Sequence, residues 1–157
     1  MIDLVPMTAE EYEVYLDTLV PDYAQEHVNA GNWPAEGAED RARKEMREIY
    51  LPDGVATQDN YLFALIDPEI DTKVGILWYA IRGTGKNREA FVYDVVVYEP
   101  FRRQGYGYQA FQKMEEKVRE IGVNVIGLHV FGYNHGARAM YEKLGFEVTD
   151  LMMRKWL

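Results

Sequence analysis

The segment Arg102–Gly107 combines arginine and glycine in a pattern suited to binding phosphate. It reads Arg-Arg-Gln-Gly-Tyr-Gly and lies between an apolar run, Phe91–Val97, and a run of helical periodicity, Tyr108–Ile121. A helix start presents backbone N–H groups that have no intrahelical acceptor, and the helix dipole adds partial positive charge there. Glycine lets the backbone approach phosphate oxygens without a Cβ in the way. We therefore expect a diphosphate to bind at this turn.

The groups expected to bind it are of two kinds, backbone donors and side-chain charges. The backbone N–H donors are those of Gln104, Gly105, Tyr106, Gly107 and Tyr108, and the charges are those of Arg102 and Arg103. A dinucleotide site is an alternative, because Gly105–Ala110 also fits the fingerprint G-x-G-x-x-G/A. That alternative predicts an acidic residue about twenty positions on. Residues 127–131 read Gly-Leu-His-Val-Phe and contain no carboxylate, which argues against it.

A second segment, Asn134–Phe146, follows one predicted helix and one predicted strand later. Together the two segments resemble the GNAT superfamily, acyltransferases that use acetyl-CoA. The loop pattern of that family, Arg/Gln-x-x-Gly-x-Gly/Ala, is matched by Arg102, Gly105 and Gly107. Its later pattern is matched by Asn134, Ala137, Tyr141, Gly145 and Phe146. The resemblance covers residues 60–157 well, whereas residues 1–59 match only as a strand followed by helices.

The resemblance implies a fold and an activity. The fold is an α/β or α+β mixed sheet: an antiparallel meander, then a parallel strand reached through a helical crossover, with helices on both faces. The activity is transfer of the acetyl group of acetyl-CoA to a primary amine by direct attack in a ternary complex. A single domain is expected over 1–157, with 1–59 on the acceptor side and 60–157 as the acetyl-CoA-binding core. The alternative class is a non-catalytic CoA-binding sensor or regulatory module.

The pantetheine arm of the cofactor is a chain of amides, and an unpaired strand edge suits it. If the strands containing Val95–Val97 and Val125–Val130 diverge after pairing at their starts, the exposed backbone can bind that arm as an added strand. The resemblance to the GNAT superfamily implies this arrangement, with cofactor contacts at Val95, Val96 and Val97 on the strand and at Asn134, Ala137 and Arg138 on the later helix. Asn134 is also expected to cap its own helix.

Two residues are candidates for moving protons. Tyr141 matches the family's general acid, and a phenol can protonate a leaving thiolate without being ionised at neutral pH; the alternative is a core tyrosine. Asp94 interrupts the apolar strand and is the candidate base, with His129 on the next strand as its expected partner. The alternative for Asp94 is a structural role. On the acceptor side we expect Glu26 and Trp33 to contact the substrate, although aromatic residues there more often pack the helices.

Composition narrows the class of protein. The 157 residues carry a net charge of −9 and no cysteine. The acidity argues against non-specific binding to nucleic acid, and the lack of cysteine excludes disulfides, thiolate metal sites and an acyl-cysteine intermediate. We expect no metal, no membrane segment, a cytoplasmic location and a small-molecule or peptide amine as acceptor. The family resemblance also permits a homodimer. The sequence leaves the acceptor and the acyl chain length open.

The order of predicted elements positions these groups. A strand at Ile2–Pro6 precedes a helix with a capping box at Thr8. Pro21 is expected either to end this helix or to be the first residue of a second helix. The remaining elements are a helix at 36–50, strands at 61–66, 74–81 and 90–98, a helix at 108–121, a strand at 123–131, a helix at 134–144 and one or two strands within 146–156.

Overall fold

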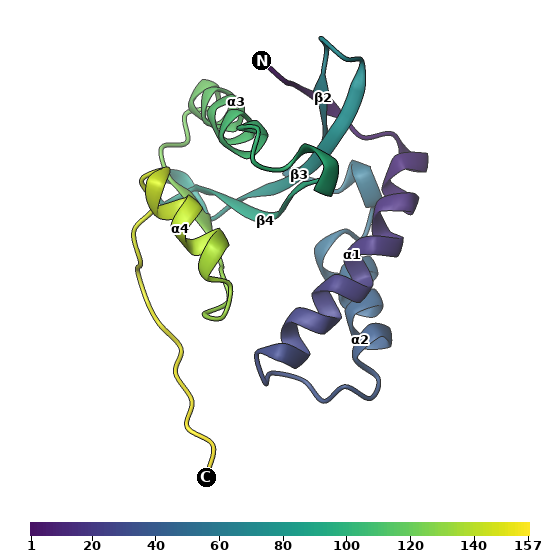
Figure 1. Cartoon of the computed structure of the whole chain (residues 1–157), viewed down its shortest axis with the longest axis vertical. Coiled ribbons are helices and arrows are strands. Elements are labelled where there is room, and N and C mark those ends of the chain that lie inside the picture. Colours follow the sequence, from purple (N-terminus) through teal and green to yellow (C-terminus); the bar gives the residue numbers. More distant parts are fainter.

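The computed structural model describes all 157 residues and confirms the mixed α/β fold. One five-stranded sheet has the order β1-β2-β3-β4-β5, with α1 and α2 on one face and α3 and α4 on the other (Figure 1). Its elements are β1 (Asp3–Pro6), α1 (Ala9–Asn29), α2 (Ala38–Glu45), a π-helical turn (Met46–Tyr50), β2 (Asn60–Asp67), β3 (Thr72–Arg82), β4 (Glu89–Val97), α3 (Tyr106–Glu120), β5 (Ile126–Leu128) and α4 (His135–Lys143).

Strands β1 to β4 form the expected antiparallel meander, and β5 pairs with β4 in parallel after the crossover through α3. Side chains alternate between the two faces of the sheet. Leu62, Ile76 and Trp78 belong to the core under α1 and α2, whereas Phe63, Leu65, Leu77 and Tyr79 belong to the core under α3. The sheet thus buries both faces, which fixes its register and the position of the edge where β4 meets β5.

Helix α1 begins with the predicted capping box. The Thr8 hydroxyl accepts from the Glu11 N–H at 3.1 Å, and the Glu11 carboxylate accepts from the Thr8 N–H at 2.8 Å. The expected break at Pro21 is wrong, because α1 runs through it to Asn29. Leu19 and Val20 before the proline and Ala24 after it are buried on the same core. Their packing offsets the roughly 3 kcal/mol that a helical proline costs.

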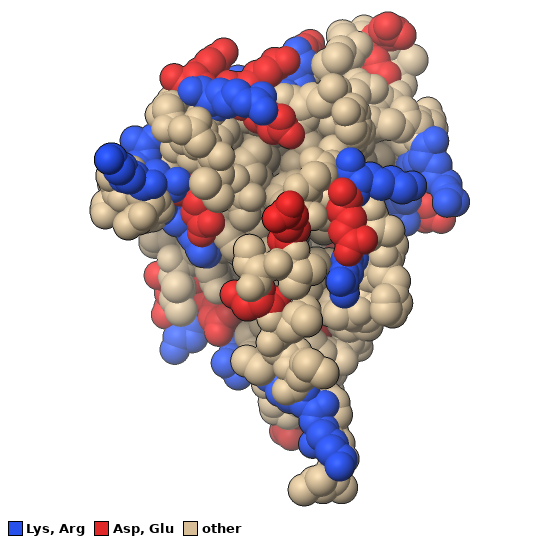
Figure 2. All heavy atoms as spheres, turned by 90° about the vertical axis from the view of Figure 1, so that its left-hand side faces the viewer, with Lys and Arg blue, Asp and Glu red and all other residues tan.

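Two expectations near the end of the chain are also wrong. The strand predicted at 123–131 is reduced to Ile126–Leu128, since β4 diverges from it beyond Val92. No strand forms within 146–156: the segment Glu147–Leu157 leaves the body as an extension that Figures 1 and 2 show at the bottom of the molecule. Its side chains at Leu151, Met152, Met153 and Trp156 are 70–84% exposed. The segment contacts its own chain through the Arg154 guanidinium, which donates to the Ala30 carbonyl at 3.2 Å.

Candidate active site

The edge between β4 and β5 opens part-way along the sheet. The two strands pair only from Ala90 to Val92, opposite Ile126 to Leu128. One residue later, the register between β3 and β4 shifts, so that Tyr93 is an extra residue in β4. A bulge of this kind bends its strand and ends local pairing. The predicted divergence is therefore present, and Asp94 to Val97 continue without a β5 partner.

The backbone direction along β4 decides which groups face this opening. The Tyr98 N–H donates to the Val74 carbonyl on β3 at 2.8 Å. Along an antiparallel strand, the N–H groups of successive residues point alternately to one neighbouring strand and to the other. The Val96 N–H, two residues before Tyr98, therefore also points to β3. In agreement, the Val96 carbonyl abuts Gly75 of β3. Val95 and Val97 therefore present their N–H groups to the side that β5 has left, where the Val95 N–H also favours the anion of Asp94.

The loop before α3 brings free N–H groups to the same end of β4. The helix begins at Tyr106, two residues earlier than predicted, with Gly105 as its N-cap at φ 84°. None of the backbone N–H groups from Gln104 to Tyr108 donates to a backbone carbonyl. A Cβ added at Gly107 would lie 3.4 Å from the Met140 sulfur and 3.9 Å from a Val97 methyl group. The lack of a side chain at Gly107 therefore lets α3 pack closely against α4 and β4.

The polar side chains of this loop differ in what they contact. The Arg102 Nε donates to the Val97 carbonyl at 3.0 Å, which ties the loop to the open edge of β4. The Gln104 amide donates to the Pro100 carbonyl at 3.1 Å. Arg103 has a left-handed φ of 62° and an exposed side chain. The loop is thus held in shape by Arg102 and Gln104, and its N–H groups remain available to an anion.

Helix α4 carries the second predicted segment. The Asn134 side chain accepts from the Ala137 N–H at 3.3 Å, which confirms Asn134 as the cap. Arg138 pairs with Glu142 at 3.0 Å on the exposed side of the helix. Tyr141 packs edge-on against Phe111 and Phe146, with ring centroids 5.9 and 5.7 Å away.

Electrostatics connect Tyr141 with the opposite face of the sheet. Burial raises the pKa of Tyr141 to about 12, and the charges of Asp94 and Glu26 add to the shift. The phenol therefore keeps its proton at neutral pH, and it lies within range of both carboxylates. Tyr141 on α4, Asp94 on β4 and Glu26 on α1 therefore lie close enough for the two carboxylate charges to act on the phenol.

Asp94 lies on β4 immediately after the bulge, and its partner differs from the one predicted. The Tyr15 hydroxyl, from α1, donates to Asp94 Oδ2 at 2.6 Å. His129 instead packs against the Phe131 ring, 4.8 Å between centroids. Burial raises the pKa of Asp94 to about 6, while the bond from Tyr15 opposes the shift. The apolar periodicity of α1 marks Tyr15 as a core residue, but a buried phenol also needs a hydrogen-bond partner, which Asp94 provides here.

Glu26 extends this acidic environment along α1. The residue is exposed overall, yet partial burial of its carboxyl, together with the charges of Asp94 and Asp22, raises its pKa to about 7. Burial raises the pKa of Tyr133, on the loop after β5, and the Glu26 charge adds to that shift. The Glu26 carboxyl, on α1, therefore lies within electrostatic range of that loop.

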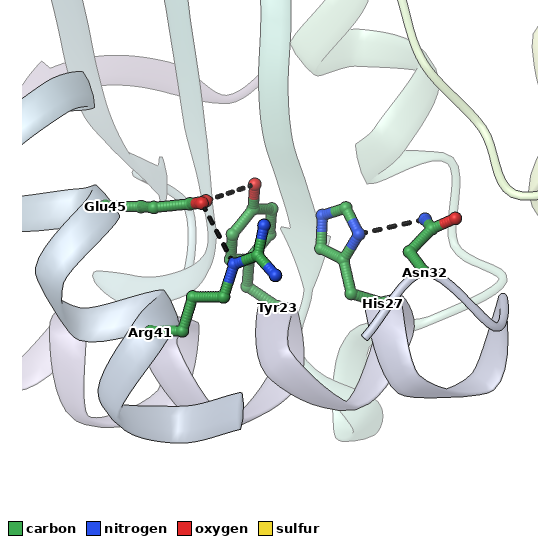
Figure 3. Close-up of polar contacts among 5 residues, drawn as sticks. All are labelled: Tyr23, His27, Asn32, Arg41 and Glu45. Atoms are coloured by element: carbon green, nitrogen blue, oxygen red, sulfur yellow. Dashed lines mark hydrogen bonds and ion pairs between the residues drawn. The ribbon is translucent and has the colours of Figure 1, made fainter. Parts of the chain in front are cut away.

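The Trp33 side chain lies among residues of α1 and α2. It is 8% exposed, with His27 stacked on it at 4.2 Å and the Arg41 guanidinium 4.3 Å from its ring centroid. Figure 3 shows Arg41 and Tyr23 meeting at Glu45, with His27 beside them. The indole is buried among these neighbours, so Trp33 contributes to the packing of α1 and α2.

An open groove of about 320 Å³ lies between α1 and strands β3 and β4. Its walls are partly apolar and carry four carboxylates, those of Glu10, Glu11, Asp22 and Asp94. The one lysine in the lining, Lys73, lies 3.8 Å from Glu11. The groove reaches Asp94 from the α1 side of the sheet and suits a positively charged group.

The model of the acetyltransferase (GNAT) family matches residues 14–146, most of the chain. The chain belongs to the GNAT family of acetyltransferases. It is similar to an uncharacterized N-acetyltransferase of Bacillus subtilis, YycN, with 38% identity over 99% of each chain. The crystal structure of YycN superimposes with a TM-score of 0.93, covering 100% of this chain and 99% of that chain. A second B. subtilis protein, the uncharacterized N-acetyltransferase YdgE, is 30% identical over 98% of this chain and 97% of its own.

Membership in the GNAT family makes this protein an acyltransferase, of the N-acetyltransferase class. None of its helices combines the length and apolar character that a membrane-spanning segment requires. The loop with the first motif is bonded to the open edge of β4, α4 packs in the same core cluster as Val95 and Val97, and the α1 side contributes the groove and its carboxylates.

Proposed function

We propose that this GNAT protein transfers the acetyl group of acetyl-CoA to a primary amine by direct attack within a ternary complex. The observation that supports this most is the opening between β4 and β5, bordered by free loop N–H groups, by Tyr141 and by Asp94. A cofactor arm and an amine can reach this opening from opposite faces of the sheet. The chain has no cysteine, so no acyl-cysteine intermediate is available.

The residues of the opening fit the chemical features of acetyl-CoA. Its diphosphate would accept from the N–H groups of Gln104 to Tyr108, beside the free guanidinium N–H groups of Arg102. Its pantetheine amides would pair with Val95 and Val97, as an added strand does. Val96 has its backbone turned to β3, so its contribution is limited to its side chain. Arg138 is engaged with Glu142, and its predicted contact requires that exposed ion pair to open.

Proton transfer is assigned to two groups. The acceptor amine must lose a proton to become nucleophilic, and the Asp94 carboxylate accepts it. The amine nitrogen then forms its bond to the acetyl carbon as the carbon–sulfur bond breaks. Tyr141 donates its hydroxyl proton to the leaving thiolate and regains one from the Asp94 side or from water. The pKa near 12 keeps Tyr141 protonated for this role.

The acceptor is proposed to be a small-molecule or peptide amine that enters along the groove on the α1 side. A primary amine is cationic at neutral pH, and the carboxylates of Asp22, Glu26 and Asp94 attract it before it gives up its proton. The cytoplasm is the proposed location, because acetyl-CoA must be accessible there. No metal is needed for these steps.

The experiment is a thiol-release assay with acetyl-CoA and a panel of small and peptide primary amines. We expect saturable release of CoA that depends on the amine, together with a mass increase of the amine by one acetyl group. Calorimetry with coenzyme A runs in parallel. Binding of coenzyme A without turnover of any amine in the panel would contradict the proposal and favour the non-catalytic module.

A homodimer is also proposed, supported by two unpaired features of the same chain. The segment Glu147–Leu157 exposes large apolar side chains, and the outer edge of β5 has no partner. A second copy offers both features reciprocally, as a two-fold interface requires. Light scattering after size exclusion should give a dimer for the full chain and a monomer for residues 1–146. A monomeric full chain at micromolar concentration would contradict this.

A further inference from the structure

Tyr15 makes the one side-chain hydrogen bond that reaches Asp94 from the helical layer. It lies in the middle of α1, is 8% exposed and packs in the core beneath that helix. Its hydroxyl approaches Asp94 Oδ2 to 2.6 Å, although the two residues are 79 positions apart in the chain. Both residues also line the groove between α1 and the sheet. The bond therefore lies at the wall of the proposed acceptor site.

The other groups around Asp94 do little to stabilise a negative charge. Asp22 and Glu26 on α1 are carboxylates, and Tyr141 on α4 is a neutral phenol. Farther along the groove are Glu10, Glu11, Tyr98 and Lys73, and this lysine pairs with Glu11 at 3.8 Å. Apart from Tyr15, the group that favours the anion of Asp94 is the Val95 backbone N–H. The Tyr15 hydroxyl is thus the principal side-chain donor to this carboxylate.

We propose that Tyr15 is a positioning residue, whose hydroxyl holds Asp94 in place and in its anionic form so that the free lone pairs of the carboxylate can accept the proton of the amine. This inference rests on the proposed function for the role of Asp94 in the reaction. The hydrogen bond and its effect on ionisation do not depend on that role.

The phenol is suited to this task because it remains a donor throughout the working pH range. Burial raises the pKa of Tyr15 well above its ordinary value, and the Asp94 charge adds to the shift. Asp94 itself is held between opposing effects, since burial favours its neutral form and the Tyr15 hydroxyl favours its anion. Without the hydroxyl, burial and the Asp22 charge act with less opposition, and Asp94 would be protonated over more of the neutral range.

The test compares Tyr15→Phe with the matched control Tyr12→Phe. Tyr12 is a buried tyrosine one turn earlier in α1; its ring lies near Gly54, and Asp94 is not among the groups that shift its pKa. Aspartate carboxyl carbons are labelled with ¹³C, Asp94 is assigned with Asp94→Asn, and its titration is followed by NMR. We expect Tyr15→Phe to raise the Asp94 midpoint by about one pH unit and Tyr12→Phe to leave it in place. An unchanged midpoint in folded Tyr15→Phe protein would overturn the proposal.

A second variant covers the case in which Tyr15→Phe fails to fold. Incorporation of 3-fluorotyrosine at position 15 retains the shape of the ring and makes the hydroxyl a stronger donor. The Asp94 midpoint should then fall, and an unchanged or raised midpoint would overturn the proposal. The pH profile of turnover separates this inference from the proposed function. A profile that shifts with the NMR midpoint supports both, whereas a shifted midpoint with an unshifted profile supports the role of Tyr15 and removes Asp94 as the base.

Discussion

Arg102 donates from its Nε to the carbonyl of Val97 at 3.0 Å, and this bond joins the two halves of the proposed cofactor site. Val97 belongs to the open edge of β4, and Arg102 begins the loop whose N–H groups have no backbone acceptor. The bond uses one of the five guanidinium donors and leaves the terminal N–H groups free. Arg102 can therefore fix the loop and contact a diphosphate at the same time.

Replacement of Arg102 by lysine should weaken binding of coenzyme A about tenfold. Lysine keeps the charge but lacks the planar set of donors that serves Val97 and a phosphate together. Calorimetry measures the dissociation constant. Arg103→Lys is the matched control, because the Arg103 side chain is exposed and contributes charge alone. Equal losses of coenzyme A affinity in the two variants would show that binding depends on the charge of the side chain and not on the bond to Val97.

Replacement of Gly105 by alanine should destabilise the protein by about 1 kcal/mol and weaken binding of coenzyme A. The φ of 84° at this N-cap is strained for any residue with a Cβ, although no neighbouring atom obstructs the added methyl group. Gly136→Ala, in the first turn of α4, also meets open space but has no positive φ. Urea denaturation should show that this control is neutral or more stable. A Gly105→Ala protein as stable as wild type would contradict the account of the loop.

Removal of the Tyr141 hydroxyl should lower turnover by about a hundredfold and leave the KM for acetyl-CoA unchanged. The reason is that phenylalanine keeps the packing against Phe111 and Phe146 but has no proton to donate. Because the pKa of Tyr141 is about 12, wild type should show no loss of activity from this group between pH 7 and 10. Tyr61→Phe, at the distant stacked pair with Tyr79, serves as the control. Normal turnover by Tyr141→Phe would remove this residue from the mechanism.

Asp94→Asn should make the protein more stable at pH 8 and inactive. The pKa of Asp94 is raised from 3.8 to about 6, so the folded state binds this proton more tightly than the unfolded state does. The wild type therefore loses stability as pH rises through about 6, whereas the variant does not. We expect a gain of about 3 kcal/mol in the free energy of unfolding at pH 8, vanishing below pH 4. Urea denaturation at both pH values measures it, and a less stable variant at pH 8 would contradict the burial of this charge.

Local patterns predicted the parts of the fold that local chemistry determines. The cap at Thr8 and the cap at Asn134 depend on residues three positions away, and both are present. The continuation of α1 through Pro21 depends on packing against the sheet. Helix propensity is a property of the local sequence and does not account for that packing. The short β5 likewise follows from the bulge at Tyr93, whose position depends on the pairing of β3 with β4.

The site shows the same division. The loop N–H groups follow from a strand, a glycine turn and a helix in sequence, whereas the open β4 edge was implied by the resemblance to the GNAT family. The partner of Asp94 does not, because Tyr15 lies 79 residues away on a helix whose other residues read as core. Trp33 was assigned to the acceptor side because it lies in the N-terminal region, and the structure adds that His27 stacks on its ring and that the Arg41 guanidinium lies 4.3 Å from the ring centroid. Contacts between distant segments are what the sequence pattern leaves undetermined.

The central claim is that the edge of β4 and the loop before α3 bind acetyl-CoA through alternate backbone groups. Residue-resolved hydrogen exchange by NMR, with and without coenzyme A, tests it most directly. We expect coenzyme A to slow exchange at Val95, at Val97 and across Gly105 to Tyr108, and to leave Val96 unchanged because its N–H already faces β3. Saturating coenzyme A that protects neither Val95 nor Val97 would contradict the account.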